Sequence, residues 1–232
     1  ISACLVGSEM CIRDSPQAII VWNILGSAYE VLGELKQAII AFKKVTELNP
    51  NYANGFNDLG ITLQTLEKYE EAVEAYKDAL LLRPNYAEVY NNIGNTLKDQ
   101  GKLNEAIDAY KQAVLLIPDT PEIHNNLGLT LKEQGKLDNS IKAYNMAISL
   151  QPDYAEAYYN LSFSYNLKGD IQKGLKFYEW RLRKKSFPVM SPRDHLTWDG
   201  KKSLLDKKFF VYEEQGLGDT IQFARYLILL KL

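Results

Sequence analysis

The residues of this chain that could carry out chemistry are few, and the most suggestive of them form a glycine-rich loop near the C-terminus. The loop spans 213–219 and includes Gly216 and Gly218, and it lies between a short apolar run at 208–212 and a helical pattern at 220–230. A strand, a glycine loop and a helix are the opening of a nucleotide-binding type of α/β unit. Ordinary strand-to-helix turns also use glycine, so a loop without catalysis remains an equal alternative.

No other group of residues predicts catalysis or a metal site. His124 fills an aromatic position of the repeat described below, so we expect it to be packed in a core, and His195 has no matching partners around it in the sequence. Cys4 and Cys11 are the only cysteines, which leaves none for a disulfide or a thiolate metal site after residue 11. We therefore expect neither a cofactor nor a metal ion.

Charge and hydropathy argue against two kinds of partner. The formal net charge of −2 gives no general attraction to nucleic acid or to an anionic membrane. No apolar run approaches the roughly 20 residues that cross a bilayer, and the N-terminus shows no signal peptide. The expectation is a cytoplasmic protein with no nucleic-acid partner and no membrane partner.

The elements that must position these residues follow a period of 34. Prolines recur at this spacing, at Pro16, Pro50, Pro84, Pro118 and Pro152, and Pro188 follows two residues late. Three further series share the period: Gly26, Gly60, Gly94 and Gly128, continued by Ser162; Trp22, Phe56, Tyr90, His124 and Tyr158; and Phe42, Tyr76, Tyr110, Tyr144 and Tyr178. Several residue types that share one period indicate an internal repeat.

This pattern closely resembles the tetratricopeptide repeat (TPR) family, in which each repeat is a hairpin of two helices. The third repeat shows the motif in full, with Tyr90, Ile93, Gly94, Leu97, Ala106, Tyr110, Ala113 and Pro118. The resemblance covers five repeats, at 19–52, 53–86, 87–120, 121–154 and 155–188. It implies an all-α superhelix of ten helices, because one hairpin cannot bury its apolar face alone.

Glycine, proline and asparagine predict where the helices begin and end. A left-handed C-terminal cap is expected between the two helices of a hairpin, at Gly33, Gly101, Gly135 and Gly169, with Glu67 departing from the rule in the second repeat. Each second helix should end before a proline. The residues after those prolines, Asn51, Asn85, Asp119 and Asp153, are expected to cap the next helix.

A row of asparagines is the most informative feature of the repeats. At 100° per residue, positions two, five, six and nine of each first helix lie opposite the core positions, on the side that forms the concave wall of a TPR superhelix. The predicted peptide-binding residues on this side are Asn57, Asn91, Asn92, Asn95, Asn125, Asn126 and Asn160, accompanied by Asn23, Asn54 and Asp58. Asparagine is a poor helix former, and its amide can donate to and accept from a peptide backbone.

This row resembles the asparagine ladder of the TPR arrays of O-linked N-acetylglucosamine transferases, which implies a grip on extended polypeptide. Two structural alternatives stay open: the amides solvate a polar groove, or they bond to one another between repeats. A basic clamp for acidic C-termini fits poorly. The inner positions hold Glu88, Glu122 and Glu156, and Lys98 and Lys132 are the only nearby cations.

The two ends depart from the repeat. Residues 1–18 resemble translated sequencing-adapter sequence, or else a diverged remnant of a repeat, and we assign them no function. Residues 189–207 are interpreted as a linker, and 208–232 as the first strand, loop and helix of a truncated α/β domain. The stretches 178–181, 198–200 and 214–226 are similar to bacterial proteins in which a TPR array precedes a glycosyltransferase-like domain.

The glycine loop also resembles the first loop of two-lobed, heptosyltransferase-type enzymes, which implies that Asp219 acts on an acceptor. Two functions follow. The first is a scaffold that binds a protein or an extended peptide in the asparagine-lined groove. The second is the substrate-recognition arm of a glycosyltransferase whose catalytic domain, and with it any nucleotide-sugar, belongs to a longer parent protein. We expect the 232-residue chain itself to have no catalytic activity.

Overall fold

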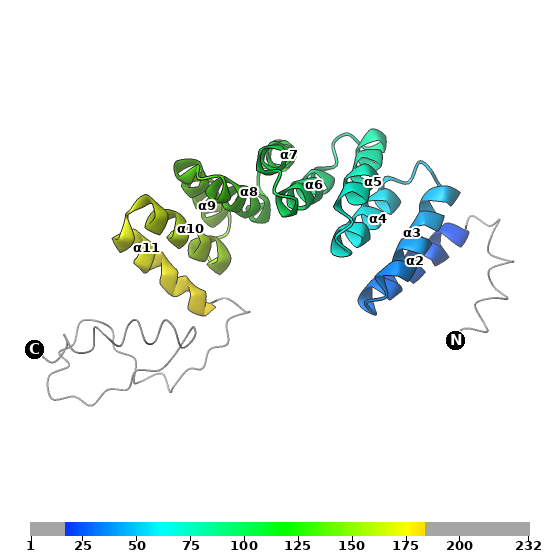
Figure 1. The fold of residues 1–232 in the computed structure, drawn as a ribbon, viewed down its shortest axis with the longest axis horizontal. Helices are drawn as coiled ribbons and strands as arrows, with labels where there is room; N and C mark the ends of the chain where they lie inside the picture. Colours follow the sequence, from blue (N-terminus) through cyan, green and yellow to red (C-terminus); the bar gives the residue numbers. More distant parts are fainter. Residues whose placement is uncertain (1–16, 184–232) are drawn as a thin grey trace, which may run out of the picture. The chain divides into compact units, whose positions relative to one another are not determined.

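The computed structural model describes residues 17–183, which form ten α-helices and a final 3-10 helix and, within that range, no strand. The helices pair into five hairpins that follow one another in chain order (Figure 1). The first helices are α2 (Gln17–Val31), α4 (Ala53–Thr65), α6 (Ala87–Asp99), α8 (Pro121–Glu133) and α10 (Ala155–Lys168). The second helices are α3 (Leu35–Leu48), α5 (Tyr69–Leu82), α7 (Leu103–Leu116), α9 (Leu137–Leu150) and α11 (Ile171–Tyr178), and η1 spans Glu179–Arg183.

The expected all-α superhelix of ten helices is therefore confirmed. Each helix packs chiefly against its partner in the hairpin, and each second helix packs in addition against the first helix of the next hairpin. The strand, loop and helix expected at 208–232, with the linker at 189–207 and the N-terminal segment before Gln17, lie outside the described residues.

The two helices of a hairpin meet where a glycine of the first lies against an aromatic ring of the second. A Cβ atom added to Gly94 would stand 2.6 Å from a ring carbon of Tyr110, so no larger residue fits there. The ring of Tyr110 is fully buried. The same close contact recurs in the neighbouring hairpins, between Gly26 and Phe42, Gly60 and Tyr76, and Gly128 and Tyr144.

The turn inside each hairpin needs a left-handed residue. Gly33, Gly101, Gly135 and Gly169 have φ angles of 75°, 75°, 80° and 88°, which confirms the predicted caps. Glu67 takes the same place in the second hairpin with φ 59°, and it is the only non-glycine residue with positive φ among those described. The Lys68 amide donates to the carbonyl of Leu63 at 2.9 Å, the six-to-one bond of a Schellman cap, so the turn keeps its form despite the side chain.

The prediction of side-chain caps after the prolines is wrong. The helices α4, α6, α8 and α10 are capped one residue later, and none of these caps makes a side-chain hydrogen bond; the cap residues are Tyr52, Tyr86, Thr120 and Tyr154. Asn51 instead follows Pro50 inside a β-turn that the Tyr52 amide closes on the carbonyl of Asn49, at 3.1 Å. Proline and asparagine are the residues that such a turn prefers at its two central positions.

The fifth hairpin departs from this packing, and its second helix is shorter than the others. Ser162 stands where the other hairpins have glycine, so its Cβ occupies the space that accepts the aromatic ring elsewhere. Tyr178, the corresponding ring, is only half-buried, and it packs against Tyr159 with 5.6 Å between ring centroids. The α-helix ends at this residue and continues as the 3-10 turn η1.

The glycine contact makes a direct prediction. Gly94→Ala places a methyl group within overlap distance of the buried Tyr110 ring, so we expect it to cost about 1–3 kcal/mol of unfolding free energy. Urea denaturation followed by circular dichroism measures this loss. Lys111→Ala, an exposed change on the same hairpin, should shift the midpoint little. Equal midpoints for the two variants would contradict the packing described here.

The turn at Glu67 makes a prediction of opposite sign. Glu67→Gly relieves a side chain held at φ 59°, so it should raise stability by about 0.5–1 kcal/mol. Gly101→Ala, at φ 75° in the next hairpin, should lower stability by a similar amount. Thermal melts of both variants test the pair, and a loss of stability in Glu67→Gly would be inconsistent with a strained turn.

Candidate functional site

The first helices form one continuous layer of the array. Although a second helix separates them in sequence, α4 contacts α6, α6 contacts α8, and α8 contacts α10. We call the side of this layer formed by positions two, five, six and nine of each first helix the inner face. All the asparagines predicted to bind peptide lie on it.

Hydrogen bonds between neighbouring repeats join these asparagines in pairs. The amide at position six of one repeat donates to the amide oxygen at position five of the repeat before it, always 35 residues away. Asn92 donates to Asn57 at 3.1 Å, Asn126 to Asn91 at 3.2 Å, and Asn160 to Asn125 at 3.1 Å. We call these three pairs the amide ladder. Bonding between repeats, one of the structural alternatives above, is thus part of what the asparagines do.

Two of the three accepting amides are more buried than the donating ones, whereas the third, Asn91, is half-buried like the donors. Asn57 and Asn125 are buried, at 3% and 4% exposure, so each would carry an unsatisfied acceptor without its partner. Asn92, Asn126 and Asn160 are half-buried and reach the surface of the inner face. Each rung uses one N–H of the donor and one lone pair of the acceptor, and a side-chain amide has two of each.

The rung that would precede this ladder is different. Its members are Asn23 and Asp58, again 35 apart, so a carboxyl group replaces the donating amide. The amide oxygen of Asn23 is buried and accepts no hydrogen bond from the described part of the chain. Burial, followed by the nearby charges of Glu30 and Glu88, raises the pKa of Asp58 to about 6, although a hydrogen bond with Asn57 opposes the shift.

Two further inner-face asparagines bond to tyrosines rather than to each other. The Tyr110 hydroxyl donates to Asn95 at 2.7 Å within the third hairpin, and the Tyr86 hydroxyl donates to Asn54 across a repeat boundary at 3.2 Å. Burial raises the pKa of Tyr110 well above its usual range, which keeps its hydroxyl a donor. Each of the seven asparagines predicted to bind peptide therefore makes at least one side-chain hydrogen bond.

A second row of polar contacts joins the turn inside one hairpin to the turn inside the next. Gln100 donates to Glu70 at 2.9 Å, and the pairs Gln134–Asn104 and Lys168–Asp138 repeat this contact 34 and 68 residues later. The members of each pair are 30 residues apart. We call this row the turn ladder.

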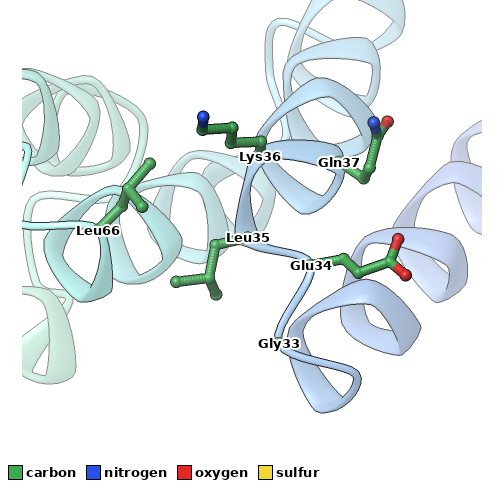
Figure 2. Close-up of a pocket in the computed structure, with 6 residues that line it drawn as sticks. All are labelled: Gly33, Glu34, Leu35, Lys36, Gln37 and Leu66. Carbon is green, nitrogen blue, oxygen red and sulfur yellow. The ribbon is translucent and has the colours of Figure 1, made fainter.

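The notches beside the turns are surface depressions rather than candidate sites. One, of about 410 Å³, is lined by residues 33–37 and Leu66; in Figure 2 the side chains of Leu35 and Lys36 extend toward the side of Leu66, whereas those of Glu34 and Gln37 extend away from it. A second, of about 450 Å³, occupies the same register around Gly135 and Lys168. Their recurrence marks them as products of the repeat.

The remaining predicted chemistry finds little support in the described residues. His124 is 6% exposed and its Nε2 lies 2.7 Å from the Pro118 carbonyl, so it is a packed histidine as expected. Residues 17–183 hold no group of three or more His, Cys, Asp or Glu side chains placed for a metal ion. No helix in this range is long and apolar enough to cross a membrane. Gly216, Gly218 and Asp219 lie outside the described residues.

Comparison with known families identifies the repeat. Family models described as the tetratricopeptide repeat match residues 19–52 and 41–74, and a model of the TPR repeat matches 65–101, 94–135 and 130–169 in succession. Together these matches cover 19–169, more than half of the chain. The chain is a tetratricopeptide repeat protein. No match extends into the segment expected to begin a glycosyltransferase-like domain.

Solved structures show the same TPR fold. A crystal structure of MamA is 27% identical to this TPR chain, has a TM-score of 0.65, and aligns over 73% of this chain and 92% of its own. PilF of Pseudomonas aeruginosa is 23% identical with a TM-score of 0.65, over 74% and 77% of the two chains. YrrB, described as a TPR protein with an unusual peptide-binding site, is 22% identical with a TM-score of 0.60, over 74% and 88%. A search of curated proteins finds no match.

The pairing rule of the TPR array was not foreseen from the sequence. The sequence repeats every 34 residues, whereas the amide ladder joins residues 35 apart and the turn ladder joins residues 30 apart. The recurrence of asparagine at two adjacent positions, as in Asn91-Asn92 and Asn125-Asn126, is the signal that could have revealed it. Gln100, Gln134 and Lys168 gave no such signal, because polar residues at a helix end are common.

The rung between Asn23 and Asp58 predicts a pH-dependent stability. Because the folded-state pKa of Asp58 is raised from 3.8 to about 6, the stability linked to its protonated form is complete below pH 4 and lost as the pH rises through 6. Asp58→Asn cannot ionise and offers an amide to Asn23. We expect its melting temperature to exceed that of the wild type at pH 7.5 and to approach it at pH 4.5.

The matched control is Asp108→Asn, which changes an exposed carboxylate on α7 and should alter the melting temperature little at either pH. If the wild type instead melts at a higher temperature than Asp58→Asn at pH 7.5, the buried Asp58 carboxylate does not destabilise the fold.

Proposed function

We propose that this TPR protein is a scaffold that binds an extended polypeptide along the inner face of its first helices. The observation that carries the proposal is the amide ladder, whose half-buried members recur at the same position of consecutive repeats. Each rung leaves N–H groups and oxygen lone pairs of its two amides unused. These groups can bond to a peptide backbone, which has the same kinds of donor and acceptor. The shared fold with YrrB, itself described as having a peptide-binding site, supports this choice.

The spacing of the ladder suits an extended chain. Packed helices lie about 10 Å apart, and an extended chain advances about 3.3 Å per residue. One repeat therefore corresponds to about three residues of bound peptide, and the three rungs correspond to about nine. Recognition through the backbone would depend little on the side chains of the peptide.

The charge of the inner face favours a basic peptide. Exposed carboxylates stand at position two of three consecutive repeats, Glu88, Glu122 and Glu156. Glu88 and Glu30 both act on Asp58, while Glu122 and Glu156 help to raise the pKa of Tyr154 to about 12, after burial as the main cause. Lys98, one of the two nearby cations, already lies 3.6 Å from Asp99. Lysine or arginine side chains of a bound peptide would balance this row of charge.

No observation favours the second function, a recognition arm for a glycosyltransferase. The residues on which it rested, Gly216, Gly218 and Asp219, lie outside the described part of the chain, and the family matches end at residue 169.

The test removes both members of one rung. Asn91→Ala with Asn126→Ala leaves no orphaned acceptor and introduces a better helix former, so stability should change by less than about 1 kcal/mol. If the amides bind the peptide backbone, affinity should fall by about five- to a hundredfold. Fluorescence anisotropy with labelled lysine-containing peptides of about twelve residues, beside glutamate-containing peptides of the same length, measures both affinity and charge preference.

The control removes a lateral hydrogen bond away from the inner face. Asn104→Ala with Gln134→Ala eliminates one rung of the turn ladder and should leave peptide affinity unchanged. The proposal fails if neither kind of peptide binds the wild type, or if the two double variants bind equally well.

A further inference from the structure

The amide ladder has different side chains on its two flanks. Along each first helix, position two lies about 4.5–6 Å before the rung positions five and six, and position nine lies about as far after them. Position two is an exposed glutamate in three consecutive repeats, the acidic row: Glu88, Glu122 and Glu156. Position nine is half-buried in repeats two to five and is apolar except at Asn95, which defines the apolar row: Ile61, Leu129 and Phe163. The ladder therefore runs between an acidic row and an apolar row.

One member of the apolar row, Leu129, deprives the fold of a hydrogen bond. In the third hairpin Asn95 accepts from the Tyr110 hydroxyl at 2.7 Å. The equivalent residues of the fourth hairpin are Leu129 and Tyr144, and leucine offers no acceptor. Tyr144 is fully buried, and its hydroxyl has no hydrogen-bond partner within residues 17–183. Because a buried hydroxyl without a partner destabilises a fold, stability by itself does not account for a leucine at this position.

The polar residues around Tyr144 are engaged elsewhere. The hydroxyl of Ser164 lies 2.9 Å from that of Ser140, in a buried contact. Lys132 stands one turn after the leucine, and its Nζ lies 5.6 Å from the centroid of the Phe163 ring in the next repeat. Burial lowers the pKa of this lysine. In the fourth and fifth repeats the flank beyond the ladder is therefore formed by a leucine, an aromatic ring and a partly buried lysine.

We infer that the peptide on the inner face carries basic side chains toward the acidic row and an apolar side chain, on the opposite side of its backbone, against Leu129 and Phe163. The inference rests on the proposed function and specifies its ligand. When one edge of an extended chain bonds to the ladder, its side chains project alternately to the two flanks. Packed helices lie about 10 Å apart, so these two members of the apolar row can flank one apolar side chain.

The two flanks make the order of residues in the peptide matter more than its composition. An apolar side chain against Leu129 leaves water, which is favourable, whereas the same side chain beside Glu122 and Glu156 gains no apolar contact. A lysine on the apolar flank would lie near Lys132, and like charges brought together weaken binding. Alternation of basic and other residues, with an apolar residue among the others, satisfies both flanks at once.

Two labelled peptides of equal composition test the inference. The ordered peptide has about twelve residues of alternating lysine and serine, with leucine in place of one central serine. The exchanged peptide has that leucine swapped with the lysine before it, so that the leucine falls on the lysine side. Fluorescence anisotropy with the full chain should give about three- to tenfold tighter binding of the ordered peptide, because only its leucine contacts the apolar row.

A variant of the apolar row links this preference to Leu129. Leu129→Asn removes the apolar contact and offers Tyr144 the acceptor that Asn95 supplies in the third hairpin. It should bind the ordered and exchanged peptides equally, and its melting temperature should equal or exceed that of the wild type. Leu115→Asn makes the same change at a leucine on α7 that is 75% exposed and lies off the inner face, and it should keep the wild-type preference.

The outcomes separate this inference from the proposed function. If the wild type binds the two peptides equally well, the inference is wrong while peptide binding on the inner face stands. Binding of neither peptide overturns both. A Leu129→Asn variant that keeps the preference for the ordered peptide, or that melts well below the wild type, also overturns the inference, because the leucine then serves the packing of the array.

Discussion

The contact of a first-helix glycine with a second-helix aromatic ring sets the geometry on which the rest of this array depends. With no side chain at Gly60, Gly94 or Gly128, the two helices of a hairpin approach until the ring itself fills the space between them. The first helices can then lie close enough to one another for short amide side chains to meet across repeats. Where Ser162 replaces glycine, the ring is displaced and the second helix ends early.

Polar bonding between hairpins follows from the same regularity. A buried amide must have a partner, and in a periodic array the same partner is available in every repeat. Asn57 and Asn125 are buried because Asn92 and Asn160 satisfy them from the next repeat. A structural role and a binding role for the ladder are therefore compatible, since one hydrogen bond per amide fixes its orientation and leaves its remaining groups in a defined position. Such fixed amides lose less entropy on binding than free side chains do.

The sequence predicts those features that one repeat determines by itself. The left-handed glycines and the aromatic series both result from a steric need inside one hairpin, and both were found from the period. The failures concern relations between segments. The caps were misplaced because Pro50-Asn51 suits a turn as well as a cap, and the backbone of Asn49 and Tyr52 decides between them. The rungs joining residues 35 apart depend on the relative shift of neighbouring helices, and only the recurrence of adjacent asparagines, as in Asn91-Asn92, points to that shift.

The amide ladder is bounded in the chain by two substitutions of opposite character. Before it, Asp58 replaces the donor, and the amide oxygen of Asn23 accepts no hydrogen bond from residues 17–183. After it, Tyr159 takes the place of the accepting amide and packs against Phe163 with 4.9 Å between ring centroids. Phe163 itself stands at position nine, where the third repeat has Asn95. Positions five and six of the inner face thus pass from a pair that contains a carboxyl group, through paired amides, to an aromatic residue. The repeats share one fold but differ in their inner-face side chains. An extended chain bound along the inner face would therefore meet different side chains at its two ends, which would favour one orientation of that chain.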